Sequence, residues 1–258
     1  MPELPDIEVF SGNLNKIFAG NQLTRVKIIN GKKLPNTASQ FTKALKGKTL
    51  RKIYRSGKEM RFKFDDGTVL GLHLMLTGDI FVFEGKNDHR STIAELYFDH
   101  GKALALTDRM RNANIKLNPI NKSGVDALSK ELNFKYLQQA LKRKNTIKKL
   151  LIDQNVIRGI GNSYSDEILW QTRISPYSIA NAIPDAKIKE LVTAIKRILK
   201  KEINRIFKKF PGKVNGEVKD FLKIHTKTHT QSPTGATIII DKHGMMKTYY
   251  TKEQKLYS

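Results

Sequence analysis

The apolar residues of this chain change their spacing once, near residue 120, and this change constrains the fold more than any other feature. Before it, short segments alternate between apolar and polar residues, as strands do, over 23–28, 50–54, 60–64, 69–76, 80–83, 93–98 and 103–106. After it, apolar residues recur at helical intervals over 134–141, 146–153, 163–171 and 185–210. The sequence therefore predicts an α+β chain in which a β-rich part precedes a helical part.

The β-rich part is expected to begin with a helix over residues 6–18, directly after Pro5. Asp66-Gly67 and His100-Gly101 are turn signals between consecutive strands, which indicates antiparallel pairing. Short strands joined by such turns predict an antiparallel β-sandwich or barrel.

The domain boundary should lie between residues 119 and 131, where the strand pattern stops. Near the end of the chain, two strand-like segments, 237–240 and 247–250, flank a glycine-containing turn and predict a small β-hairpin. We therefore expect domains at 1–120, 131–224 and 225–258.

Charge and composition narrow the class of partner. Lys and Arg total 47 against 24 Asp and Glu, so the formal net charge of +23 favours a polyanion such as nucleic acid. A solvated lysine-rich surface or a ribosome-associated protein would explain the same excess. The chain has no cysteine, which excludes disulfides and zinc–cysteine sites. Neither a secretory signal nor a membrane span is apparent, so we expect an intracellular protein. It would be cytoplasmic, of bacterial type and nucleoid-associated, or otherwise intracellular.

The first candidate for chemistry is the amino terminus. The small side chain of Pro2 normally permits removal of Met1, which would expose a secondary amine. Such an amine can attack a sugar C1′ and form an iminium, and Glu3 could transfer the protons that this reaction needs. The alternative is an amino terminus without a catalytic role, because many proteins begin with Met-Pro.

The second candidate is the segment 158–164, between two predicted helices. Its two glycines would let backbone amides approach a phosphate at the start of a helix, and the amide of Asn162 could donate to that phosphate. The alternative is a plain glycine turn in which Asn162 is the helix N-cap.

With these two segments in one chain, the sequence resembles the formamidopyrimidine-DNA glycosylase and endonuclease VIII family of DNA repair enzymes. That family opens with Pro-Glu-Leu-Pro-Glu, and residues 2–6 here read Pro-Glu-Leu-Pro-Asp. Its helix-two-turns-helix signature is similar to residues 150–154 and 159–162, followed by Tyr164 and residues 166–169. The resemblance implies an N-terminal helix plus antiparallel β-sandwich, then a helix-two-turns-helix domain with a hairpin finger.

The resemblance also implies a bifunctional glycosylase and lyase. In this family pattern Pro2 attacks C1′ as the damaged base leaves, Glu3 manages protons at the opening sugar ring, and β,δ-elimination cuts the strand on both sides. Lys58 matches a loop lysine that contacts phosphate beside the lesion, although a solvated lysine at a strand start is its alternative. Asn162, with Gly161 beside it, matches the family's phosphate-binding asparagine. His89 looks like its phosphate-contacting histidine, with a surface turn histidine as the alternative.

The side chains that fill the gap left by a flipped nucleotide depart from the family pattern. Leu76 stands at the first of these gap-filling positions, called wedges below. The simpler alternative is that Leu76 is a buried leucine of a strand. Met110 and Asn112 replace the family's arginine and phenylalanine, so Arg109 or Arg111 would have to read the opposite base from a neighbouring position. Fewer wedges imply weaker distortion of the duplex or a preference for unstacked substrates.

The expected finger also departs from the family pattern. Gln231, Thr234, Thr251 and Gln254 stand at the positions of the family's four zinc-binding cysteines. The resemblance therefore implies a zincless finger that is held by packing alone and is locally weak. Met246 replaces the finger's phosphate-binding arginine, and Lys247 beside it is the remaining DNA-binding candidate.

The leading hypothesis is therefore a base excision repair enzyme, acting through a Pro2 iminium on double-stranded DNA with damaged bases or abasic sites. It requires no metal and no soluble cofactor, binds no membrane, and should be a monomer. One alternative is a catalytically weak protein that binds damaged or branched DNA, and another is a general nucleic-acid binder. The family's gap-filling arginine and phenylalanine and its finger arginine are missing, which weakens the case for lesion recognition. Lyase activity is therefore a firmer expectation than excision of oxidised purines.

Overall fold

The computed structural model describes residues 1–244 and 246–258. These residues form two compact units, the first made of 1–121 and 206–217 and the second of 122–205 and 218–258. The limits 1–120, 131–224 and 225–258 remain a prediction for functional domains, although by compactness the segment 206–217 groups with the N-terminal part of the chain. In the described part of the chain, none of the helices combines the length and apolarity that crossing a bilayer requires.

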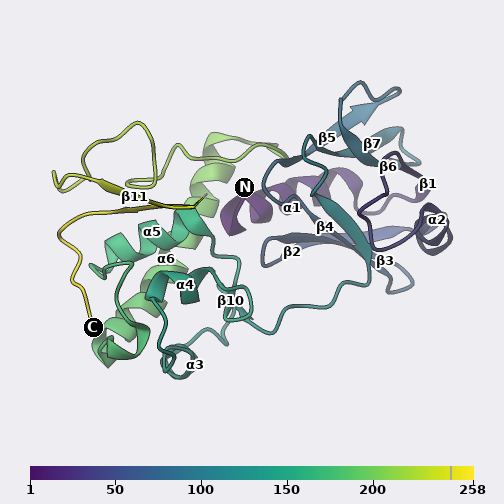
Figure 1. The fold of residues 1–258 in the computed structure, drawn as a ribbon. Helices are drawn as coiled ribbons and strands as arrows, with labels where there is room; N and C mark the ends of the chain where they lie inside the picture. The colour runs from purple at the N-terminus through teal and green to yellow at the C-terminus, as the bar shows by residue number, and fades with distance from the viewer. Residues whose placement is uncertain (245) are drawn as a thin grey trace. The chain divides into compact units, whose positions relative to one another are not determined.

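The first unit contains two separate four-stranded antiparallel sheets (Figure 1), so the alternative of a closed barrel is wrong. One sheet has the order β1-β6-β7-β5, with β1 Leu23–Ile28, β6 Thr92–Phe98, β7 Lys102–Asp108 and β5 Gly78–Glu84. The other has the order β2-β3-β4-β8, with β2 Leu50–Ser56, β3 Glu59–Phe64, β4 Val69–His73 and β8 Asn114–Leu117.

Helix α1 (Leu4–Phe18) packs against β2 and β3. Ile7, Phe10 and Leu14 recur on one face of the helix and are completely buried. The helix begins two residues before the predicted start, since Pro5 is accepted in the first turn, where its missing N–H costs no hydrogen bond. Sequence reasoning missed the short helix α2 (Ala38–Leu45), which buries only Phe41 and Leu45.

The second unit is mainly helical, as predicted. Its elements are β9 (Val125–Asp126), α3 (Phe134–Ala140), α4 (Ile147–Ile152), β10 (Ile157–Arg158), α5 (Asn162–Gln171), the 3₁₀ helix η1 (Ala180–Ala182), α6 (Asp185–Lys209, its last residues grouped with the first unit), β11 (Ile239–His243) and β12 (Met246–Tyr250). Strands β11 and β12 pair antiparallel, which confirms the C-terminal hairpin, although β11 extends into the predicted turn. Trp170 of α5 packs with Ile224, Ile238 and Tyr249, so the hairpin shares its core with the helices.

Candidate functional site

The amino terminus is held by an ion pair within the first unit. The Met1 ammonium lies 3.0 Å from Oε2 of Glu217, and both groups are partly exposed. Glu217 ends the segment 206–217, which is fastened to α1 by a 2.8 Å hydrogen bond from Asn13 Nδ2 to the Lys213 carbonyl. Sequence reasoning missed Glu217, since 216 positions separate it from Met1 and no motif marks it.

Pro2 and Glu3 are both buried at the start of α1. With Met1 in place the nitrogen of Pro2 is an amide, so the predicted nucleophile exists only after Met1 is removed. Glu3 is the N-cap residue of α1, and its N–H donates to Asp6 Oδ2 at 3.1 Å within a capping box. The helix therefore fixes the Glu3 carboxyl group beside the residue that would carry the amine.

Lys58 lies in the tight turn between β2 and β3. Gly57 precedes it with φ +62°, a conformation that glycine adopts without strain. Arg55 joins this turn to α1, because its Nε lies 2.6 Å from Glu8 Oε2 and its Nη1 donates to the Gly57 carbonyl at 3.1 Å. The Lys58 side chain is buried, so the alternative of a solvated lysine is wrong.

Leu76 lies in the turn between β4 and β5 and is 57 % exposed, which excludes a buried strand leucine. Met75 in the same turn and Met110, after β7, are large exposed apolar side chains too. The Thr77 hydroxyl donates to Asp108, which ties the two turns together. Sequence reasoning treated Met110 only as the replacement of an arginine and missed that it is itself an exposed apolar side chain.

Asp108 also organises the loop that contains Arg109 and Arg111. Burial would raise the pKa of Asp108, but hydrogen bonds from the Thr77 hydroxyl and from three backbone N–H groups hold this pKa below its usual value. Both arginines are exposed. Asn112 is engaged elsewhere, because its Oδ1 accepts from Lys33 Nζ at 2.8 Å. The loop thus presents two cations from a fixed backbone.

His89 is exposed in the loop between β5 and β6. Its ring stacks on Phe81 with 3.8 Å between centroids and 17° between planes. This stacking orients the imidazole, and it is compatible with either phosphate contact or a plain surface histidine.

The turn between α4 and α5 brings together Asn162 and Lys247, two of the predicted DNA-binding residues. Asn162 Nδ2 donates to the Lys247 carbonyl at 2.9 Å, so the turn is joined to β12 of the hairpin. The N-cap residue of α5 is Gly161, and the alternative that Asn162 is the N-cap is therefore wrong. Gly159 has φ +109°, and its N–H donates to Gln154 Oε1 at 2.9 Å, which fixes the turn.

A buried ionic network fastens the hairpin to the helices. Asp166 Oδ1 lies 2.6 Å from Lys148 Nζ, and its Oδ2 accepts from the Tyr249 N–H at 3.0 Å and lies 2.7 Å from His225 Nδ1. Lys148 Nζ also donates to the Thr248 hydroxyl at 2.9 Å. The aspartate thus joins α4, α5 and β12.

The neighbouring carboxylate holds the segment before the hairpin. Glu167 Oε1 accepts hydrogen bonds of 2.8 to 2.9 Å from the backbone N–H groups of Lys223, Ile224 and His225. Burial raises the pKa of Glu167, and these three hydrogen bonds oppose that rise. Two adjacent residues of α5 therefore position both the hairpin and the segment that leads to it.

Comparison with known families matches both units of the fold. The formamidopyrimidine-DNA glycosylase N-terminal domain matches residues 1–115, and the helix-two-turns-helix (H2TH) domain of the same enzymes matches 123–209. The chain belongs to the formamidopyrimidine-DNA glycosylase family.

Curated relatives in the family include the formamidopyrimidine-DNA glycosylase of Lactobacillus gasseri, 32 % identical over 206 residues that cover 74 % of this chain and 73 % of the relative. That of Herpetosiphon aurantiacus is 31 % identical over 216 residues, covering 79 % and 78 %. The Lactococcus lactis formamidopyrimidine-DNA glycosylase, solved bound to DNA with an abasic site, has a TM-score of 0.87 and 24 % identity, covering 98 % of this chain and 99 % of that one. This last likeness shows the shared fold.

The zinc site typical of the family does not fit this finger. Thr234 and Thr251 donate their hydroxyl groups to Glu253 Oε2, at 2.8 and 3.2 Å. Gln254 accepts from the Thr251 N–H and donates to the Ile174 carbonyl, both at 2.8 Å. Zinc prefers thiolate and imidazole ligands, whereas here hydroxyl and amide groups are hydrogen-bonded, the hydroxyls to the Glu253 carboxylate. The expectation that packing alone holds the finger is therefore wrong. Among residues 1–244 and 246–258, no cluster of three histidine or acidic side chains could hold a metal ion.

We therefore expect a zinc chelator to leave the thermal stability of this formamidopyrimidine-DNA glycosylase family member unchanged. Its melting temperature after dialysis against EDTA should shift by less than about 1 °C, because hydrogen bonds and packing hold the finger. Thermal unfolding followed by circular dichroism gives the measurement. A large fall that added zinc reverses would contradict this assignment.

Proposed function

We propose that the chain is a DNA glycosylase of base excision repair that also cleaves abasic sites, with Pro2 as its nucleophile. The observation that carries the proposal is the buried Pro2-Glu3 pair at the cap of α1, in a chain that matches the N-terminal and H2TH family models. Its substrate is double-stranded DNA that contains a damaged base or an abasic site.

The chemistry follows from the two residues. The Pro2 amine, free once Met1 is removed, bonds to C1′ while the bond from C1′ to the base breaks, and the base leaves with a proton. Glu3 protonates the ring oxygen as the sugar opens to the iminium. Removal of protons from the opened sugar then expels the phosphates in turn by β- and δ-elimination, and water releases Pro2. Lys58 is proposed to bind phosphate beside the reacting sugar.

The remaining candidate residues are proposed to engage the DNA around the lesion. Leu76 would fill the gap left by the flipped nucleotide, with Arg109 or Arg111 near the opposite base. His89, Gly161, Asn162 and Lys247 would bind phosphates.

Covalent trapping tests the proposal. The protein, prepared with Pro2 as its first residue, is incubated with a duplex containing one abasic site, and borohydride is added to reduce the iminium to a stable amine. Mass spectrometry of the digested adduct should place the DNA on Pro2. Measurable DNA binding without an adduct would overturn the proposed enzyme activity and favour the damage-binding alternative. Met110, Asn112 and Met246, which depart from the family pattern, support that alternative.

Asn162→Ala should weaken binding to abasic-site DNA about tenfold, because a hydrogen bond to a charged group contributes on the order of 1.5 kcal/mol. Fluorescence anisotropy with a labelled duplex measures the affinity. Asn181→Ala is the matched control, since Asn181 is an exposed asparagine in η1 of the same unit. Equal affinity of the two variants would refute the phosphate contact.

A further inference from the structure

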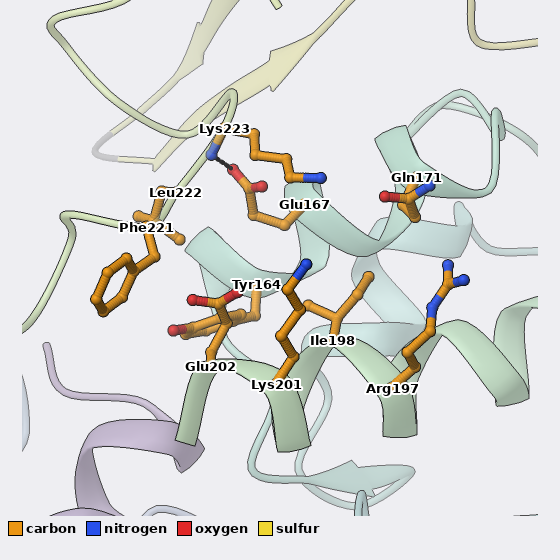
Figure 2. Close-up of a pocket in the computed structure, with 10 residues that line it drawn as sticks. All are labelled: Tyr164, Glu167, Gln171, Arg197, Ile198, Lys201, Glu202, Phe221, Leu222 and Lys223. Carbon is orange, nitrogen blue, oxygen red and sulfur yellow. Dashed lines mark hydrogen bonds between the residues drawn. The ribbon is translucent and has the colours of Figure 1, made fainter. Parts of the chain in front are cut away.

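A cavity of about 190 Å³ lies within the second unit, among α5, α6 and the segment 221–223 (Figure 2). None of the residues assigned above to DNA lines it. Its lining residues are Tyr164, Glu167, Gln171, Arg197, Ile198, Lys201, Glu202, Phe221, Leu222 and Lys223.

One buried oxygen in this cavity has no partner. Glu202 is only 6 % exposed, and its Oε1 lies 3.1 Å from Arg205 Nη1. Its Oε2 is buried and accepts no hydrogen bond. A buried carboxyl oxygen without a partner is costly, so a ligand that donates a hydrogen bond there would remove that cost. Burial raises the pKa of Glu202, Arg205 opposes this rise, and the nearby Glu167 adds to it.

Three other residues that line the cavity are basic. In Figure 2, Arg197 and Lys201 extend from α6 towards α5, while Lys223 comes from the segment that covers the pocket. Both α6 cations are exposed. Three cations at one mouth favour an anionic group on the ligand.

The lining also includes apolar surface, namely the rings of Tyr164 and Phe221 and the side chains of Ile198 and Leu222. Arg197 and Glu202 are five residues apart on α6, a rise of about 7.5 Å along the helix. A bare inorganic anion would leave Glu202 Oε2 without a donor, and a simple cation would be repelled at the mouth. The lining therefore fits a ligand in which a planar group that carries an N–H donor is covalently linked to an anionic group.

We propose that this cavity is a binding site for a nucleoside monophosphate, with the base towards Glu202 and the phosphate at Arg197, Lys201 and Lys223. An exocyclic amino group of the base donates to Glu202 Oε2, and the aromatic walls pack against the ring. The site is independent of the Pro2 chemistry, so its failure would leave the proposed function unaffected.

The single tryptophan provides the readout. Trp170 is the only tryptophan of the chain, and Lys223 Nζ lies 5.2 Å from its ring centroid. Titration with 2′-deoxyguanosine 5′-monophosphate at physiological salt should change the fluorescence of Trp170 and saturate. Deoxyguanosine and deoxyribose 5-phosphate should each bind at least about tenfold more weakly, because each lacks one half of the ligand.

Three variants test the geometry. Glu202→Gln and Lys201→Ala should each weaken binding of the nucleotide about tenfold, as expected for loss of a charge-assisted hydrogen bond. Lys200→Ala removes a neighbouring exposed lysine that does not line the cavity, and it should bind as the wild type does. Melting curves identify any variant that fails to fold, and Lys201, being exposed, is replaceable without loss of the fold.

Two results would overturn the site. If deoxyribose 5-phosphate bound as tightly as the nucleotide, the cavity would only be an anion site. If Lys200→Ala and Lys201→Ala weakened binding equally, the nucleotide would be held by the general positive charge of the chain.

Discussion

A form of the protein that keeps a residue in front of Pro2 should bind abasic-site DNA but fail to cut it. Any such residue converts the Pro2 nitrogen into an amide, whose lone pair is delocalised and cannot attack C1′. Loss of a covalent nucleophile costs on the order of 1,000-fold or more in rate. The structure accommodates residue 1, since the Met1 ammonium pairs with Glu217, so the blocked form should fold.

The comparison needs one preparation divided in two. A short N-terminal extension is fused to Pro2 through a protease site that leaves Pro2 first after cleavage, and strand scission is followed on denaturing gels before and after cleavage. Cutting at similar rates in both forms would contradict the role of Pro2. If both forms bound DNA equally and only the cleaved form cut it, the role of Pro2 in catalysis would be separate from DNA recognition.

Asp166→Asn should destabilise the second unit by about 3 kcal/mol, because it leaves Lys148 as a buried charge without its counter-ion. Both side chains are almost fully buried and their charged atoms lie 2.6 Å apart. The hairpin should loosen first, since Asp166 also accepts from the Tyr249 N–H. Chemical denaturation measures the free energy of unfolding, and hydrogen exchange shows whether residues 246–250 lose protection.

Asp88→Asn is the matched control, as it removes the same charge from an exposed loop of the first unit. It should change the free energy of unfolding by less than about 0.5 kcal/mol. A comparably small effect of Asp166→Asn would show that packing around Trp170 holds the hairpin without the ionic network.

The sequence predicted most strands and helices because their periodicity is local. Strand β1 has the predicted bounds, 23–28, although a register shift between Leu23 and Arg25 interrupts its alternation. The short helix α2 was missed even though Thr37 and Gln40 form a capping box, because only two buried side chains mark it. Strand β4 ends at His73, before the predicted Leu76, because the chain turns there and exposes Leu76.

The candidate site was predictable only where a motif marked it. Pro2, Glu3 and Asn162 lie in short recognisable segments, whereas their partners come from distant parts of the chain. Asn162 and Lys247 are 85 positions apart, and Met1 and Glu217 are 216 apart. Such pairs arise from tertiary packing, which leaves no local pattern in a single sequence.

The hydrogen-bonded finger also differs from a zinc finger in its sensitivity to oxidants. A finger built on zinc thiolates loses its metal when an oxidant converts a thiolate to sulfenic acid or a disulfide. Here the same frame is held by threonine hydroxyls, a glutamine amide and the Glu253 carboxylate, and the chain has no thiol to oxidise. Peroxide that damages bases in DNA would therefore find no redox-sensitive ligand in this finger.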